Sequence, residues 1–180
     1  MRELERALTV EDVVGRTLEG TAVTYGRPYR VSDDGGATYY REQWEAGAFA
    51  ASITASRNTF EFRRSHADER LGIVSFTDEE SRLAFTATVD DSDEGEQALE
   101  QYHRGTLRGV SLRFRPRRHA PPDERGVLVR LRADIRELSL TNSGQYGDAK
   151  VLVARNAATL QTIERMLVDG QRVLDYSRLV

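Results

Sequence analysis

Alternation of apolar and polar residues is the main pattern along this chain of 180 residues. In residues 109–115 the apolar positions alternate with Ser111, Arg113 and Arg115. Successive side chains of a strand point to opposite faces, so this run predicts a strand whose apolar side packs on a core. Ser111 is expected on the other face, turned away from the core. Similar patterns predict strands at 16–25, 59–64, 71–76, 82–89, 127–132 and 135–141, with turns at 77–81 and 121–126.

Helix signals are fewer and stand at the ends of these runs. A short helix is expected near 46–55, after a Gly- and Asp-rich loop at 26–36. The triplet 91–93 is an N-terminal cap signal for a helix that runs to about His103, with acidic residues in its first turns. Residues 156–176 carry apolar side chains at helical spacing, which predicts a terminal amphipathic helix.

These elements predict a mostly β protein with short α-helices. Short strands joined by hairpins favour a small antiparallel β-barrel, closed or partly closed. The barrel is expected to occupy residues 1–155, and residues 156–180 to form a C-terminal helix or tail.

Composition narrows the classes of protein. Hydrophobic residues make up 39% of the chain and charged residues 31%, which is typical of a soluble folded domain. No apolar run approaches the roughly 20 residues of a membrane span, so we expect no membrane partner. The absence of cysteine excludes disulfides and thiolate nucleophiles and fits a cytosolic setting. The three histidines are scattered, so we expect neither a metal site nor a cofactor.

Charge is unevenly distributed although the net charge is only −3. Residues 78–100 hold nine acidic residues and one arginine, whereas residues 104–136 hold ten arginines and three acidic residues. Such a basic face could meet an acidic partner or nucleic acid. The arginines lack interleaved aromatic residues suited to stacking on bases, so a solvated surface is favoured. Nucleic-acid binding remains the weaker alternative.

A serine, a histidine and a carboxylate stand where a nucleophilic triad could form. Alternation places Glu137 on the face of strand 135–141 opposite its leucines, together with Ser139. If this strand neighbours that of Ser111, both polar groups lie on one side of the sheet. Glu137 could then orient His66, which would take the proton of Ser111. The structural alternatives are a surface serine, an exposed loop histidine and a glutamate paired with an arginine.

Landmarks spread over residues 18–155 resemble those of the tailed-phage prohead (head-maturation) serine proteases, whose fold is similar to that of the herpesvirus assemblin proteases. It is their order and spacing that carry the resemblance. The landmarks are Gly20-Thr-Ala-Val-Thr-Tyr-Gly26, Trp44-Glu-Ala-Gly-Ala-Phe49, Ser65-His66-Ala-Asp68, Leu71-Gly72-Ile73, Arg82-Leu-Ala-Phe85, Tyr102-His-Arg-Gly-Thr-Leu107, Gly109-Val-Ser111-Leu-Arg-Phe114 and Glu137-Leu-Ser-Leu140.

The resemblance implies a serine endopeptidase with Ser111 as nucleophile, His66 as general base and Glu137 as the acidic member. Backbone N–H groups near the nucleophile, helped by an arginine, would stabilise the oxyanion. Two departures stand out: Arg113 replaces a frequent glycine, and residues 141–148 lack the proline that often follows the last strand.

The resemblance also implies partners and a location. The substrates would be the major capsid protein with its scaffolding segment, other internal head proteins and the protease itself, cut inside the viral procapsid in the bacterial host cytoplasm. Residues 156–180 would suit a self-cleaved tail. Homo-oligomerisation is left open. The alternative function is a non-catalytic β-barrel module for capsid assembly or scaffolding.

Overall fold

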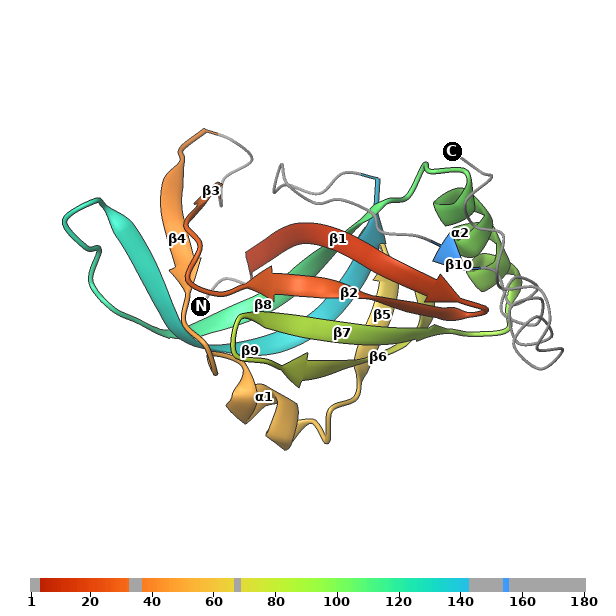
Figure 1. Ribbon diagram of the computed structural model, residues 1–180, viewed down its shortest axis with the longest axis horizontal. Coiled ribbons are helices and arrows are strands. Elements are labelled where there is room, and N and C mark those ends of the chain that lie inside the picture. Colours follow the sequence, from red (N-terminus) through yellow and green to blue (C-terminus); the bar gives the residue numbers. More distant parts are fainter. Residues whose placement is uncertain (1–3, 33–36, 67–68, 143–153, 156–180) are drawn as a thin grey trace, which may run out of the picture.

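The computed structural model describes residues 4–32, 37–66, 69–142 and 154–155, and every structural statement below refers to this part of the chain. A single curled sheet dominates it, with two helices at its sides (Figure 1). The elements are β1 (Leu4–Val14), β2 (Thr17–Thr24), β3 (Tyr29–Val31), β4 (Tyr40–Trp44), α1 (Ala50–Ala55), β5 (Phe60–Arg64), β6 (Arg70–Asp78), β7 (Arg82–Val89), α2 (Asp93–His103), β8 (Gly109–His119), β9 (Val127–Thr141) and β10 (Ala154–Arg155).

The strand pairings form a closed ring. They run from β1 through β2, β7, β6, β5, β9 and β8, and β8 pairs again with β1. The sheet therefore curls into a small barrel, as the sequence predicted. Most pairs are antiparallel, but β4 and β5 each pair with β9 in parallel. Sequence alternation does not reveal this difference, because the long connections that parallel pairing requires leave no local pattern.

The barrel interior is filled by the apolar face of each strand, and α2 packs with its apolar side on it. Trp44 lies at one end of this core, with its ring centroid 4.5 Å from that of Phe49 and 4.8 Å from that of Phe114. The side chains with no measurable exposure are those of Leu18, Phe49, Phe62, Leu71, Leu83, Leu112, Phe114, Leu138 and Leu140, among others.

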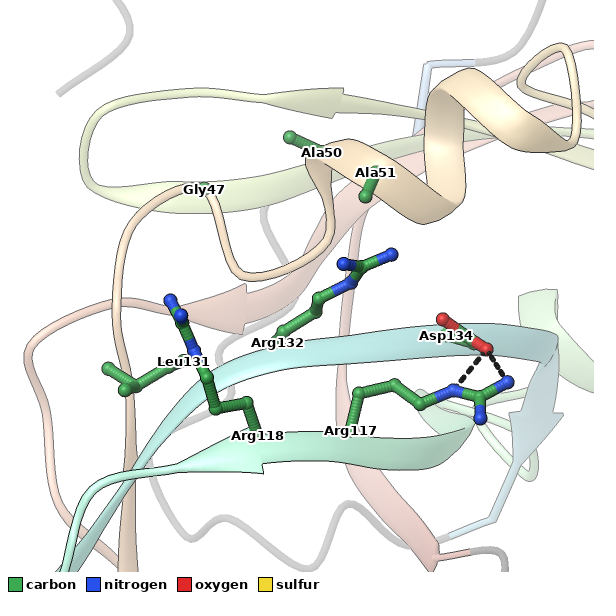
Figure 2. A pocket seen from close by; sticks show the side chains of 8 residues that line it. All are labelled: Gly47, Ala50, Ala51, Arg117, Arg118, Leu131, Arg132 and Asp134. Carbon is green, nitrogen blue, oxygen red and sulfur yellow. Dashed lines mark hydrogen bonds and ion pairs between the residues drawn. The ribbon is translucent and has the colours of Figure 1, made fainter.

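β9 is one strand of 15 residues, where the sequence predicted two. Its pairing partner changes along its length, from β4 at 127–130 to β5 at 137–140. Between these segments β9 forms hydrogen bonds with the α1 region instead of with β4 or β5. The Ala133 N–H donates to the Ala48 carbonyl at 3.0 Å, and the Ile135 N–H donates to the Ser52 hydroxyl at 2.9 Å. These bonds fix α1 beside the middle of β9 (Figure 2).

The other predicted elements agree with the structure to different degrees. The predicted strands at 16–25, 59–64, 71–76 and 82–89 are confirmed as β2, β5, β6 and β7. α2 is also confirmed, and its Ser92 cap accepts a hydrogen bond from the Gly95 N–H at 3.1 Å. The expectation of an uninterrupted loop at 26–36 was wrong, because β3 lies within it and pairs with β4.

The predicted helix at 156–176 lies outside the described residues. Within the described part, neither helix has the length and apolar character needed to cross a bilayer.

Candidate active site

The register of β8 against β9 brings the predicted polar residues together. Ser111 lies directly opposite Ser139, and Arg113 lies opposite Glu137. Directly opposed residues of an antiparallel pair share a face, so all four occupy the face opposite the buried leucines. The predicted placement of Ser111 and Glu137 on one side of the sheet is therefore confirmed.

Around Ser111 and Glu137 that face is buried, which corrects the expectation that Ser111 is simply turned away from the packed interior. Ser111 and Glu137 are each only 5% exposed, and Ser139 has no exposure. β8 is paired along both edges here, with β1 on one side and β9 on the other. Side chains from the end of β5 pack over the carboxylate of Glu137, as described below, so this end of the face becomes a second, polar interior.

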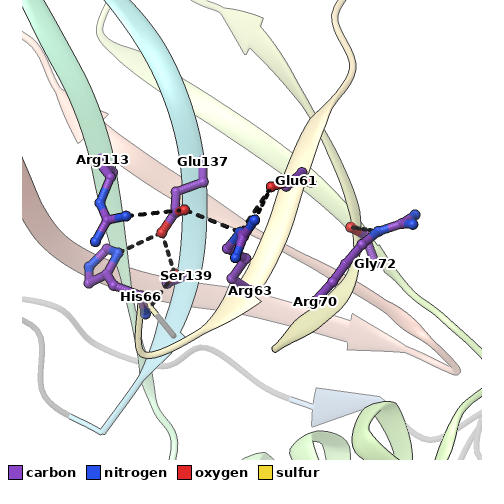
Figure 3. A network of polar contacts seen from close by, with 8 residues as sticks. All are labelled: Glu61, Arg63, His66, Arg70, Gly72, Arg113, Glu137 and Ser139. Carbon is purple, nitrogen blue, oxygen red and sulfur yellow. Dashed lines mark hydrogen bonds and ion pairs between the residues drawn. The ribbon is translucent and has the colours of Figure 1, made fainter. Parts of the chain in front are cut away.

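His66 enters this polar interior from the turn that follows β5. Parallel pairing with β9 continues beyond the strand, because the Ser65 N–H donates to the Leu140 carbonyl at 2.9 Å. The His66 N–H then donates to the Ser139 hydroxyl at 3.1 Å. Ser65 and His66 have φ values of 46° and 58°, a left-handed conformation that costs a non-glycine residue on the order of 1 kcal/mol. The two hydrogen bonds to β9 stabilise this turn in its left-handed conformation, and the turn points the imidazole toward Glu137 (Figure 3).

A direct hydrogen bond joins the imidazole to the carboxylate. The distance from His66 Nδ1 to Glu137 Oε1 is 2.8 Å. Nδ1 must donate in this bond, so in the neutral imidazole Nε2 is the nitrogen that accepts a proton. This tautomer is the one that a general base needs beside a nucleophile.

Two arginines and a serine complete the surroundings of Glu137. Its Oε1 also accepts a hydrogen bond from the Ser139 hydroxyl at 3.1 Å, while Oε2 lies 3.3 Å from Arg63 Nε and 3.6 Å from Arg113 Nη1. Burial acts to raise the pKa of Glu137, but the His66 hydrogen bond, the charge of Arg113 and the Ser139 hydroxyl outweigh it and lower this pKa below its ordinary value. The carboxylate is therefore ionised at neutral pH, and it orients the histidine and pairs with arginines at the same time.

Ser139 and Arg63 are the members of this cluster for which the sequence predicted no role. Ser139 accepts from the His66 backbone and donates to Glu137, so it links the histidine to the carboxylate, and it lies opposite Ser111 in the strand register. Strand alternation had already placed it beside Glu137, which was the available signal. No sequence signal indicated a role for Arg63, because its approach to Glu137 depends on the parallel pairing of β5 with β9.

Ser139 is the residue related to both Ser111 and His66, to the first through strand pairing and to the second through a hydrogen bond. Within the described ranges no hydrogen bond of the Ser111 hydroxyl is found, to His66 or to another residue, and Ser111 is 5% exposed. In the same part of the chain, no group of three or more histidine and acidic side chains is arranged to hold a metal ion.

Comparisons with known proteins identify the family of this chain. The family model of the caudovirus prohead serine proteases matches residues 5–164. Among solved structures, that of the bacteriophage T4 capsid assembly protease is similar, with 11% sequence identity and a TM-score of 0.41, over 69% of this chain and 97% of that one. A search of curated proteins gave no match. The family match spans most of the sequence and confirms the resemblance drawn from the landmarks: the chain belongs to the caudovirus prohead serine protease family.

Proposed function

We propose that this protein is a serine endopeptidase of phage head maturation, with Ser111 as nucleophile, His66 as general base and Glu137 as the carboxylate that orients the imidazole. The observation that carries the proposal is the 2.8 Å hydrogen bond from His66 Nδ1 to Glu137 Oε1, on the face of the sheet that also holds Ser111. Membership of a peptidase family supports the same reaction class.

The arrangement supports the following reaction. Ser111 Oγ attacks the peptide carbonyl carbon while His66 Nε2 takes the hydroxyl proton, and the resulting imidazolium lies against the ionised Glu137. The imidazolium then gives the proton to the leaving amine, and the acyl-enzyme is hydrolysed by water through the same base. Ser139 keeps the imidazole in place, because it holds the backbone of His66 and the carboxylate together.

The negative oxygen of the tetrahedral intermediate needs donors. β8 pairs with both β1 and β9 at residues 109–114, so the backbone N–H groups beside Ser111 are engaged in the two ladders. A side-chain donor is therefore favoured over the backbone donors that the sequence suggested. Arg113 is two residues from Ser111 on the same face, and its guanidinium is the proposed donor.

The substrates follow from the family rather than from the site. Prohead proteases act in phage head maturation, so we propose that this chain cuts the scaffolding segment of the major capsid protein and its own chain, inside the procapsid in the bacterial host. The proposed autocleavage predicts that wild-type protein shortens on storage while Ser111→Ala stays whole, as measured by intact mass.

Co-expression with the capsid protein of the same phage tests the proposal. Wild type should shorten the capsid protein, whereas Ser111→Ala and His66→Ala should leave it whole. Ser81→Ala, in the exposed turn between β6 and β7, is the matched control and should cut like wild type. Cleavage by Ser111→Ala at the wild-type rate would refute the assignment. An uncut capsid protein that assembles only in the presence of wild type would instead favour the non-catalytic assembly module.

A further inference from the structure

A cleft lies between α1 and the far half of the β8–β9 hairpin, away from the catalytic residues (Figure 2). Its volume is about 680 Å³. One wall comes from the chain around the start of α1 and the other from both strands of the hairpin. The cleft is lined by Gly47, Ala50, Ala51, Arg117, Arg118, Leu131, Arg132 and Asp134.

The charges in this cleft are unbalanced. Arg117 is paired with Asp134, whose Oδ2 lies 2.6 Å from Arg117 Nε. Arg118 and Arg132 lie directly opposite each other in the register of β8 and β9, and both are exposed. In the described part of the chain no carboxylate pairs with either of them. Like charges that face each other across a strand pair are destabilising, so a negatively charged ligand would relieve this repulsion.

Strand alternation places this cleft on the same face as the catalytic residues. Arg115 follows Arg113 by two residues on β8, and Asp134 lies opposite Arg115. Arg132, two residues before Asp134 on β9, then shares that face as well. A continuous face of the hairpin thus carries Ser111 near one end and the exposed Arg118 and Arg132 near the other.

The separation corresponds to a short stretch of extended peptide. Arg117 and Arg118 follow Ser111 by six and seven residues, which is roughly 20–23 Å at about 3.3 Å per residue. A substrate that lies extended along this face would therefore bring a side chain about six or seven residues from the cleaved bond to the cleft.

The lining favours a peptide over a nucleic acid. Ala50, Ala51 and Leu131 contribute apolar surface beside the guanidiniums, and Asp134 places a carboxylate in the same cleft. A phosphate backbone gains nothing from these groups, and no aromatic side chain lines the cleft to stack a base. Carboxylate side chains on an otherwise ordinary peptide match both the charge and the apolar surface.

We propose that this cleft is a distal substrate subsite, in which Arg118 and Arg132 bind aspartate or glutamate side chains about six residues from the bond that Ser111 cleaves. The subsite rests on the proposed protease function, since it assigns a preference to that reaction. It would select acidic segments of the substrate polypeptide and hold them along the β8–β9 face.

Cleavage of a diverse peptide library tests the preference without knowledge of the natural substrate. Wild type should cut bonds that have Asp or Glu enriched five to seven residues away on one side. The enrichment should vanish in R118A/R132A and turn toward Lys and Arg in R118E/R132E, with the residues next to the bond unchanged. R41A/R104A, which removes two exposed charges elsewhere, should keep the wild-type profile. Cleavage by wild type without any such enrichment would refute the subsite and leave the protease function intact.

Binding measured on the Ser111→Ala variant separates the two proposals. A fluorescent peptide with alternating Glu and Ala should bind about tenfold more weakly to S111A/R118A/R132A than to S111A, and its binding should weaken with salt. If wild type cuts nothing while S111A binds the peptide in this manner, the protease function fails and the cleft still binds acidic peptide. Equal binding to both variants, or displacement of the peptide by duplex DNA at lower concentration, would overturn the proposal.

Discussion

Replacement of Ser139 by alanine removes the one side chain that joins the proposed base, the proposed carboxylate and the strand opposite the nucleophile. Its hydroxyl is fully buried, donates to Glu137 at 3.1 Å and accepts from the His66 N–H at 3.1 Å. Loss of a hydrogen bond to a charged acceptor, together with a buried N–H left without an acceptor, should lower the free energy of unfolding by about 2–4 kcal/mol.

The same substitution should also slow the chemistry, since the turn at His66 would lose one of the bonds that hold its left-handed conformation. We expect the reaction of Ser111 with a fluorophosphonate probe to slow by about 10- to 100-fold, because general-base catalysis depends on the position of the imidazole. In this reaction the serine oxygen bonds to phosphorus, fluoride leaves and His66 takes the proton, so no peptide substrate is needed.

Ser52→Ala is the matched control. Ser52 is also buried, and its hydroxyl also accepts from a backbone N–H, that of Ile135 at 2.9 Å, but within the described residues it forms no hydrogen bond with His66 or Glu137 and joins α1 to β9 instead. Urea unfolding should show a loss of about 1–3 kcal/mol, while the labelling rate stays within about twofold of wild type. If both serine variants label at the wild-type rate below their unfolding midpoints, the positioning role of Ser139 is wrong.

Glu137→Gln should slow fluorophosphonate labelling by about 10²- to 10⁴-fold, less than His66→Ala, because the orienting group is easier to replace than the base. Because the pKa of Glu137 is lowered from its ordinary value of 4.5, the ionised carboxylate stabilises the fold at pH values above 4.5. This stabilisation is lost as the pH falls through the lowered pKa. The urea midpoint of wild type should therefore drop more steeply in acid than that of Glu137→Gln. Glu42 and Arg130 form a buried ion pair, with 3.0 Å between Glu42 Oε2 and Arg130 Nε. E42L leaves the arginine charge without its partner, so it should lower the free energy of unfolding by about 3–5 kcal/mol, and E42L/R130M should recover most of this loss in urea unfolding. Equal losses in both variants would argue against an uncompensated charge. A Cβ at Gly72 would lie 2.0 Å from the Thr88 carbonyl oxygen, so G72A should lower the free energy of unfolding by at least about 1–3 kcal/mol. A thermal midpoint equal to that of wild type would contradict this close approach.

Strand alternation and cap signals predicted a large part of the fold, because both act over a few residues. The run at 109–115 predicted β8 with the correct face for Ser111, and the cap at Ser92 predicted the start of α2. The short strands β3 and β4 were not predicted, since strands of three and five residues beside a Gly- and Asp-rich stretch have too few positions to show alternation. β3 pairs with β4, and β4 pairs with β9, which lies more than 80 residues later in the chain.

The proposed site shows the same division between local and distant effects. Alternation put Glu137 and Ser139 on one face with Ser111, so the residue types that a triad needs could be chosen from the sequence. The burial of that face could not, because it arises from the parallel approach of β5 and the turn that carries His66. The arginine cleft has the same origin, as Arg118 and Arg132 become neighbours only through the register of β8 and β9.

The identity of the nucleophile is the central claim, and the site of fluorophosphonate attachment tests it most directly. After incubation of the wild-type protein with the probe, peptide mass spectrometry should locate one adduct on Ser111, formed at a rate that His66→Ala reduces by at least about 10²-fold. Ser111→Ala should remain unlabelled while unfolding at a urea concentration close to that of wild type. An adduct on a different serine, or equal labelling of the Ser111→Ala variant, would contradict the account.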